Sequence, residues 1–218
     1  SFDKVTQVLQ SERSYLFKVY VLSIFAKFVE LRWDTLSLEN KAELRNFISS
    51  YITAAASFQD GTLQQDKVVH VLRYADIVLI NVLKYDWPKL WPNFIPDLIQ
   101  AAGNSPDMCA NCFFILRGLA QEFSNFTDCN NLTSTQQAEM IGLFNEQFEL
   151  IIPVIEFALD STDNPNLINT VLSSLKTFLE TIDESVFLGT GKIFSTICEK
   201  LLPDHRFTIN CIGVFGEL

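Results

Sequence analysis

Apolar residues recur at intervals of three and four along most of the chain, which is the spacing of one face of an α-helix. Three stripes show this spacing clearly: Leu44, Phe47, Ile48, Tyr51, Ile52 and Ala55; Met108, Cys112, Ile115, Leu116, Leu119 and Phe123; and Ile168, Val171, Leu172, Leu175, Phe178, Leu179 and Ile182. No comparable stretch alternates with the period of two that a half-buried strand requires. The pattern therefore predicts an all-α chain.

The breaks between the apolar stripes carry the residues that start and stop helices. Ser37 and Ser105 stand where capping residues are expected, and Pro106 and Pro165 stand at first helical positions, where proline is favoured. Stripes and breaks together predict about ten helices, at residues 2–10, 14–32, 38–57, 63–86, 93–102, 106–124, 134–160, 165–182, 190–202 and 205–218. Pro153 falls inside the seventh helix and is expected to kink it.

Taken in pairs, these helices form units of about 40 to 60 residues, which is the scale of HEAT-type repeats. We therefore expect a right-handed α-α superhelix, a solenoid of about five HEAT-type helix pairs. No flexible linker divides the chain, so residues 1–218 are expected to form a single HEAT-repeat segment. Apolar helical patterns run up to both ends, and we expect this segment to be truncated at both of them.

Composition narrows the class of protein further. The chain is 48% hydrophobic with only 8 Gly and 7 Pro, which favours long helices over a turn-rich fold. The net charge of −10 argues against a nucleic-acid surface, which needs clustered Lys and Arg. No run of about 18 apolar residues is free of charge, so we expect no membrane span. Five Cys without a scaffold spacing fit a reducing compartment.

The residues that carry catalysis or bind metals form no recognisable site in the sequence. His70 and His205 lie on different predicted helices, and Cys109 and Cys112 lack the second pair of ligands that a zinc site needs. Residues 189–192, GTGK, imitate the end of a phosphate-binding loop without its first Gly or its following Ser or Thr. We therefore expect no catalytic residue, no metal site and no cofactor, and a binding protein rather than an enzyme.

Residues 86–95, DWPKLWPNFI, contain two Trp-Pro pairs four positions apart. Each Pro removes a backbone donor and pushes the preceding residue out of the helical region, so this segment cannot continue a regular helix. We expect a rigid elbow after the long helix at 63–86, with two Trp side chains as large apolar anchors. The residues of this structural elbow are Trp87, Pro88, Trp91, Pro92 and Phe94.

The elbow resembles one in an early repeat of the β-karyopherins, the nuclear transport receptors of the importin-β superfamily. Its pattern, Asp/Glu-Trp-Pro-x-x-Trp-Pro-x-Phe-Ile, is most similar to the exportin branch that carries cargo with leucine-rich signals. A second match, KVYVLSIFAKFVELRW at residues 18–33, resembles a helix of that branch that ends in a basic-Trp pair. The resemblance covers most of the chain and weakens after about Asn125. It implies the amino-terminal HEAT-repeat region of a longer exportin.

The resemblance also implies partners and a location. In this family the amino-terminal repeats clasp the GTP form of the small GTPase Ran, chiefly through inner helices. The groove for the export signal lies much further along a longer chain, so nuclear export cargo would bind only through regions absent here. Phenylalanine-glycine nucleoporins are further partners in the family. The receptors shuttle between nucleus and cytoplasm through the nuclear pore.

Three predicted helices carry a polar stripe opposite the apolar one, and on an inner helix such a stripe would line the concave side of a solenoid. The second helix offers Tyr20, Ser23, Lys27 and Glu30; the fourth offers Lys67, His70, Tyr74, Asn81 and Lys84; the sixth offers Asp107, Asn111, Phe114, Gly118 and Gln121. From the stripes and the resemblance we predict Ran contacts at Tyr20, Ser23, Lys27, Lys67, Tyr74, Asn81, Asn111 and Phe114, with Phe114 exposed. The simpler interpretation is that the stripes are solvated and that Phe114 packs on a neighbouring repeat.

Two other functions remain open at the level of the sequence. The chain could belong to another β-karyopherin, either an importin or a different exportin, and in an importin Ran would expel cargo. It could instead be a structural α-solenoid scaffold without a GTPase partner. Adsorption of nucleotide-loaded Ran separates the scaffold from the receptors, and an export-signal groove in a full-length sequence separates exportin from importin.

Overall fold

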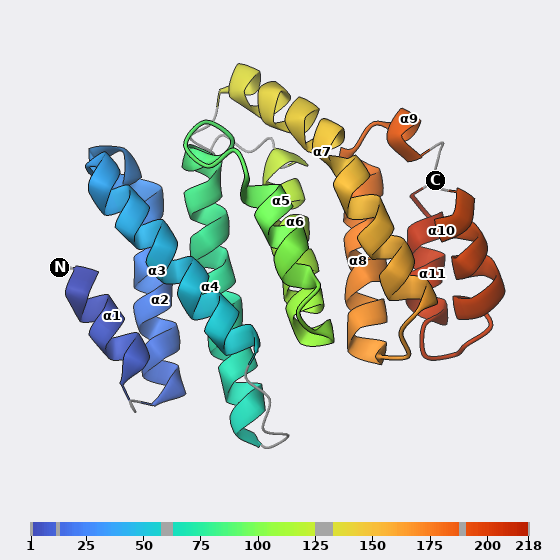
Figure 1. The fold of residues 1–218 in the computed structure, drawn as a ribbon, viewed down its shortest axis with the longest axis horizontal. Helices are drawn as coiled ribbons and strands as arrows, with labels where there is room; N and C mark the ends of the chain where they lie inside the picture. Colours follow the sequence, from blue (N-terminus) through green and yellow to red (C-terminus); the bar gives the residue numbers. More distant parts are fainter. Residues whose placement is uncertain (1, 12–13, 58–62, 125–132, 188–190, 218) are drawn as a thin grey trace. The chain divides into compact units, whose positions relative to one another are not determined.

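The structure is a computed structural model that describes residues 2–11, 14–57, 63–124, 133–187 and 191–217 (Figure 1). Every regular element in these ranges is a helix: α1 (Phe2–Gln10), α2 (Tyr15–Arg32), η1 (Trp33–Thr35), α3 (Leu38–Ala56), α4 (Leu63–Asp86), α5 (Phe94–Ala102), α6 (Pro106–Ser124), α7 (Ser134–Asp160), α8 (Pro165–Thr181), α9 (Glu184–Phe187), α10 (Gly191–Thr196), η2 (Ile197–Leu201) and α11 (Thr208–Phe215). The prediction of an all-α chain is confirmed.

The predicted helices are all present; the ninth, expected at 190–202, is observed as α10 followed by η2, and the tenth, α11, starts and ends three residues inside its expected bounds. The cap predicted at Ser37 accepts a hydrogen bond from the Asn40 N–H at 3.3 Å, and Ser105 accepts one from the Met108 N–H at 3.1 Å. Helix α7 continues through Pro153. The sequence pattern missed the two shortest elements, η1 and α9, because neither spans enough residues to show a period.

The chain divides into two compact units, Ser1–Asp86 and Trp87–Leu218, which we describe separately. In the first unit α2 packs against α1 and α4, and α3 packs against α4. In the second, α6 packs against α5 and α8, α8 packs against α7 and α11, and α11 packs against η2. Within each unit, helices that are adjacent in sequence form pairs. The second helices of consecutive pairs then pack on each other, as α2 does on α4 and α6 does on α8. This is the HEAT-type pairing that was predicted.

The first unit is organised around a buried carboxylate at the end of α4. Asp86 is completely buried, and it accepts a hydrogen bond from the Trp33 indole Nε1–H at 2.7 Å. Its other oxygen accepts one from the Arg45 guanidinium at 2.9 Å, and Arg45 is itself largely buried. A carboxylate at the carboxyl end of a helix faces the negative end of the helix dipole, which makes these two partners necessary. They join η1, α3 and α4.

The second unit has an aromatic core. Its rings form a connected series in which each neighbouring pair of centroids is 5.3 to 6.0 Å apart: Trp87, Phe123, Phe144, Phe178, Phe148 and Phe187. The series links the elbow to α6, α7, α8 and α9. Tilted and edge-on contacts of this kind are favourable beyond the area that they bury. Five of the 19 Phe residues of the chain belong to this series.

The elbow separates α4 from α5, as expected, since α4 ends at Asp86 and α5 begins at Phe94. Its side chains are not equivalent. Trp87 is 2% exposed, whereas Trp91 is only half-buried and packs edge-on against the buried Phe94 ring with centroids 5.0 Å apart. Of the two Trp anchors expected, one is a core residue and the other lies at the surface. Pro88 is half-buried and Pro92 is exposed.

We expect Asp86→Ala to destabilise the protein by about 3–5 kcal/mol, because it leaves the Arg45 charge and the Trp33 indole N–H buried without their acceptor. Urea denaturation followed by circular dichroism measures this loss. The matched control is Asp34→Ala, which removes an exposed carboxylate from η1 and should change stability by less than about 0.5 kcal/mol. Equal effects of the two substitutions would show that the buried network contributes nothing.

We expect Trp87→Ala to cost about 3–5 kcal/mol, because it removes a ring from the aromatic core. Trp91→Ala should cost about 1–2 kcal/mol, because much of that ring is already solvated in the folded state. Thermal unfolding of both variants gives the comparison. A larger loss from Trp91→Ala than from Trp87→Ala would contradict the assignment of core and surface roles within the elbow.

Candidate partner-binding surface

Helices α2 and α4 lie side by side and carry six of the eight predicted contact residues (Figure 1). These six are Tyr20, Ser23 and Lys27 on α2, and Lys67, Tyr74 and Asn81 on α4. The other two, Asn111 and Phe114, lie on α6 in the second unit. The site is therefore built from the first unit alone. We call it the α2–α4 surface, and its exposed or half-buried residues are Tyr15, Tyr20, Ser23, Lys27, Lys67, His70 and Tyr74.

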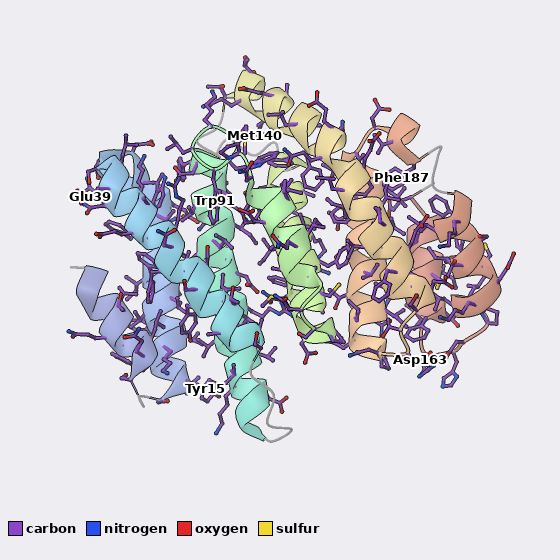
Figure 2. The ribbon with its side chains drawn as sticks, in the orientation of Figure 1. Tyr15, Glu39, Trp91, Met140, Asp163 and Phe187 are labelled. Carbon is purple, nitrogen blue, oxygen red and sulfur yellow. The ribbon has the colours of Figure 1, made fainter. Side chains whose placement is uncertain are left out.

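An aromatic and cationic cluster occupies one end of this surface. The His70 imidazole lies between two phenol rings, with its centroid 6.0 Å from that of Tyr15 and 5.6 Å from that of Tyr74. The Lys67 ammonium is 5.9 Å from the centre of the Tyr15 ring, within range of a cation–π contact. Tyr15, which Figure 2 labels, is thus the α2 residue that meets Lys67 and His70 of α4. The cluster offers both flat rings and positive charge to a partner.

A polar network fastens α2 to α4 further along the same pair of helices. Lys27 pairs with Glu30 at 2.7 Å, and Glu30 also accepts a hydrogen bond from the Asn81 Nδ2 at 3.3 Å. The same Asn81 group donates to the Ala26 carbonyl at 3.4 Å, and the Tyr85 hydroxyl donates to the Glu30 carbonyl at 3.0 Å. Because Asn81 bonds to the backbone of the neighbouring helix, its role here is to position the surface.

Three predicted contact residues are less exposed than the sequence pattern implied. Asn81 is 4% exposed and Asn111 is 1% exposed, although both were expected on solvated polar faces. Phe114 was expected to be exposed and is half-buried, with the Arg117 guanidinium 5.4 Å from its ring centre. Helical spacing gives the direction of a side chain but not what covers it. For Asn81 the covering element is α2.

Sequence reasoning did not include Tyr15 among the contact residues. A signal for it existed, because Tyr15 lies seven positions before Leu22 and eleven before Ala26, both of which are buried. These intervals place all three on one face of α2. His70 was within the predicted polar stripe, and its contact with Tyr74 is an i,i+4 pair of the same helix, whereas its contact with Tyr15 depends on the packing of α2 against α4.

The α2 helix also exposes an apolar stripe. Its members are between 39% and 66% exposed: Phe17, Tyr20, Ile24, Phe28 and Leu31. Their spacing of three and four places them on one face, and Tyr20 belongs both to this stripe and to the predicted contact set. An exposed apolar face bordered by polar groups is typical of an interaction surface. The α2–α4 surface is therefore amphipathic.

The negative charge of the chain is not shared between the two units. Residues 1–86 contain ten Lys and Arg against ten Asp and Glu, whereas residues 87–218 contain six against sixteen. The entire net charge of −10 therefore belongs to the second unit. The α2–α4 surface itself presents Lys27 and Lys67. A strongly basic partner surface is thus complementary in charge to the second unit and not to the first.

The described residues contain no group of three or more His, Cys, Asp and Glu side chains that could hold a metal ion. Cys109 and Cys112 are buried; burial raises the pKa of the Cys109 thiol to about 11, and the Cys112 thiol donates to the Leu98 carbonyl at 3.4 Å. Of the GTGK segment, residues 188–190 lie outside the described part of the chain. No described helix is long and apolar enough to cross a membrane.

Comparison with known proteins shows the family to which the chain belongs. The family described as Exportin 1-like protein matches residues 68–215. The chain therefore belongs to this family of helical-repeat proteins. It is 31% identical to Protein EXPORTIN 1A of Arabidopsis thaliana over 222 residues, an alignment that covers 99% of this chain and 20% of that protein.

Relatives from other organisms match over similar lengths. Exportin-1 of Schizosaccharomyces pombe is 32% identical over 207 residues, covering 92% of this chain and 18% of the relative. Exportin-1 of Drosophila melanogaster is 26% identical over 221 residues, covering 100% of this chain and 20% of the relative. The chain thus spans about a fifth of the length of the curated relatives that it matches.

We expect Asn81→Ala to destabilise the protein by about 1–2 kcal/mol, because it removes the hydrogen bonds that hold α4 to the Ala26 carbonyl and to Glu30. Ser23→Ala is the matched control, since the exposed Ser23 hydroxyl bonds only to the Tyr20 carbonyl of its own helix. It should change stability by less than about 0.5 kcal/mol. Chemical denaturation distinguishes the two, and an unchanged midpoint for Asn81→Ala would mean that Asn81 does not fasten the helices.

Proposed function

We propose that this chain is part of a nuclear export receptor and contributes to binding the GTPase Ran in its GTP form, without catalysing a reaction. The observation that carries the proposal is the match of nearly the whole chain to proteins named exportin in a plant, a yeast and an insect. The α2–α4 surface supports it, because it exposes aromatic, apolar and cationic side chains on two adjoining helices. Tyrosine and other aromatic residues are enriched at the centre of protein interfaces.

We assign the Ran contact to the exposed part of this surface, at Tyr20, Ser23, Lys27, Lys67 and Tyr74. Their ring faces and ammonium groups can cover apolar area and meet carboxylates or carbonyls of a partner. Asn81 would contribute indirectly, without touching Ran, because its hydrogen bond to the Ala26 carbonyl positions α2 on α4. In the second unit Phe114, half-buried on α6, stays a predicted contact, whereas the buried Asn111 is left out of the contact set.

The proposed mechanism is recognition coupled to cargo. The switch segments of GTPases are ordered by the γ-phosphate, so a surface that fits the ordered form prefers Ran-GTP. Such coupling is reciprocal, because a cargo that tightens Ran binding must itself be bound more tightly when Ran is present. Cargo with leucine-rich export signals would bind outside these 218 residues, which cover about a fifth of the relatives. The receptor would shuttle between nucleus and cytoplasm, with phenylalanine-glycine nucleoporins as partners at the pore.

The test is binding of the protein to immobilised Ran loaded with GTP or with GDP. We expect a dissociation constant on the order of micromolar or weaker for Ran-GTP, because one contact patch lacks the gain in effective concentration that several linked patches provide. Tyr20→Asp and Lys67→Glu should each weaken binding by about tenfold, because each removes an exposed contact group and places a negative charge without a partner in the proposed interface.

Leu38→Asp is the matched control for this test. Leu38 is 68% exposed on α3, so the substitution adds the same charge at an exposed apolar position away from the proposed contacts. It should leave Ran binding unchanged, and all three variants should keep the helicity of the parent protein. Equal binding of the GTP and GDP forms would contradict the exportin mechanism. Binding of neither form would favour the scaffold function, and a control as weak as the variants would remove the α2–α4 surface from the proposal.

A further inference from the structure

One side of α7 is packed and the other is open to solvent. The packed side is formed by Gln137, Met140, Phe144, Phe148, Ile151, Ile155, Ala158 and Leu159, which are all buried. It meets α5, α8, α9 and α10. Figure 1 shows α7 as the long yellow to orange helix, and Figure 2 labels Met140 on its packed side. The helical period identifies the residues on the opposite side of α7, which form a different set.

The open side combines carboxylates with apolar side chains. Five acidic residues recur at intervals of seven, three, seven and four, which keeps them within one arc of the helix: Glu139, Glu146, Glu149, Glu156 and Asp160. No Lys or Arg occurs anywhere in α7. Leu150 is 46% exposed and Phe157 is 64% exposed, and they lie two helical turns apart in the same arc.

Lysines from outside the helix approach the ends of this arc but not its middle. Lys89 lies 3.5 Å from Glu139, and Lys192 lies 3.5 Å from Glu156 and 3.9 Å from Asp160. These are long contacts of exposed lysines with exposed or half-buried carboxylates and are worth little. Among the described residues no ion pair is formed by Glu146 or Glu149, the two carboxylates next to Leu150.

Pro153 adds an acceptor at the same place. Proline has no N–H, so the Glu149 carbonyl lacks the donor that residue 153 would provide in a regular helix. Pro153 is exposed and lies between Leu150 and Phe157 on the open side. The middle of α7 thus presents two carboxylates and a backbone carbonyl beside two apolar side chains. We call Glu146, Glu149, Leu150, Pro153 and Phe157 the outer face of α7.

We propose that the outer face of α7 is a docking site for a basic amphipathic helix of a partner protein. Leu150 and Phe157 are spaced to meet apolar residues that repeat every two turns on a partner helix. Arginine side chains that flank such a stripe would bind Glu146, Glu149 and the free carbonyl, because a guanidinium offers five N–H donors and forms bidentate bonds to carboxylates. The partner's sign of charge follows from the second unit, which carries the whole net charge of −10. The site shares no residue with the α2–α4 surface, and the proposal does not depend on Ran.

The test uses the whole 218-residue protein and a synthetic fluorescent peptide. The probe is a helix-forming peptide of about 18 residues with Leu at every third or fourth position and Arg on both sides of that stripe. Its control has Glu in place of every Arg. Fluorescence anisotropy should give saturable binding of the Arg peptide and none of the Glu peptide. Affinity should fall with added salt without disappearing, because the apolar contacts are not screened.

Variants locate the site on α7. Glu146→Gln with Glu149→Gln, and separately Phe157→Ser, should each weaken binding of the Arg peptide by about tenfold, because each removes one of the two kinds of contact. The matched control is Glu39→Gln with Glu43→Gln, which removes two exposed carboxylates from α3 (Glu39 is labelled in Figure 2) and should leave affinity unchanged. Circular dichroism should show unchanged helicity for all three, since the replaced side chains are exposed.

Four results would overturn the proposal. Absence of saturable binding to the Arg peptide would do so directly. An equal loss of affinity in the α3 control would show that the peptide responds only to the net charge of the protein. Unchanged affinity of Phe157→Ser would show that the apolar anchors are not used. Sedimentation of the protein alone as a dimer that Phe157→Ser converts to a monomer would make a second copy of this chain the occupant of the face.

Discussion

A buried carboxylate connects three elements of the first unit, η1, α3 and α4. Asp86 ends α4, where the helix dipole opposes a negative charge, and it is completely removed from solvent. Such a group is tolerated only with strong partners, which Trp33 and Arg45 provide at 2.7 and 2.9 Å. The two sequence matches that carry the family resemblance end in Trp33 and begin with Asp86. The hydrogen bond between Trp33 and Asp86 gives a physical reason for both sequence matches, because it joins two residues that lie 53 positions apart in the sequence.

The described core of the second unit is built from aromatic rings instead of a buried ion pair. It begins with Trp87, whose ring starts a series of aromatic contacts that extends to Phe187 through α6, α7 and α8. Rings fill the space between helices of unequal tilt and supply large apolar area per residue. Among the described residues of this unit, no Asp or Glu side chain is buried. The exposed carboxylates of the outer face of α7 are the clearest example.

Both candidate surfaces act by complementarity rather than by chemistry. The α2–α4 surface combines rings, apolar side chains and ammonium groups, and it is supported by a network in which Asn81 and Glu30 fix one helix against the other. The outer face of α7 offers carboxylates beside Leu150 and Phe157. The two surfaces therefore favour partners of different charge. In a helical-repeat protein the side chains on such faces are free to vary while the packed faces keep the fold.

Local sequence determined the helices and nearly all their ends, because periodicity, caps and proline act within a few residues of where they occur. Ser37 and Ser105 cap helices as expected, and the two Trp-Pro pairs interrupt the helix where expected. The resemblance to a transport family was likewise contained in short motifs. Much of the surface chemistry could be anticipated too, since Tyr20, Ser23, Lys27 and Lys67 are exposed as the helical period implied.

What only the tertiary structure decided is which side chains a neighbouring element covers. Asn81 shares a helical face with Tyr74, yet α2 covers Asn81 and leaves Tyr74 half-exposed. Trp87 and Trp91 occupy equivalent positions in two Trp-Pro pairs, and only the first stacks on Phe123 in the core. A period reports the direction of a side chain from its own helix axis. Burial depends on residues tens of positions away, whose approach is set by the packing of whole helices.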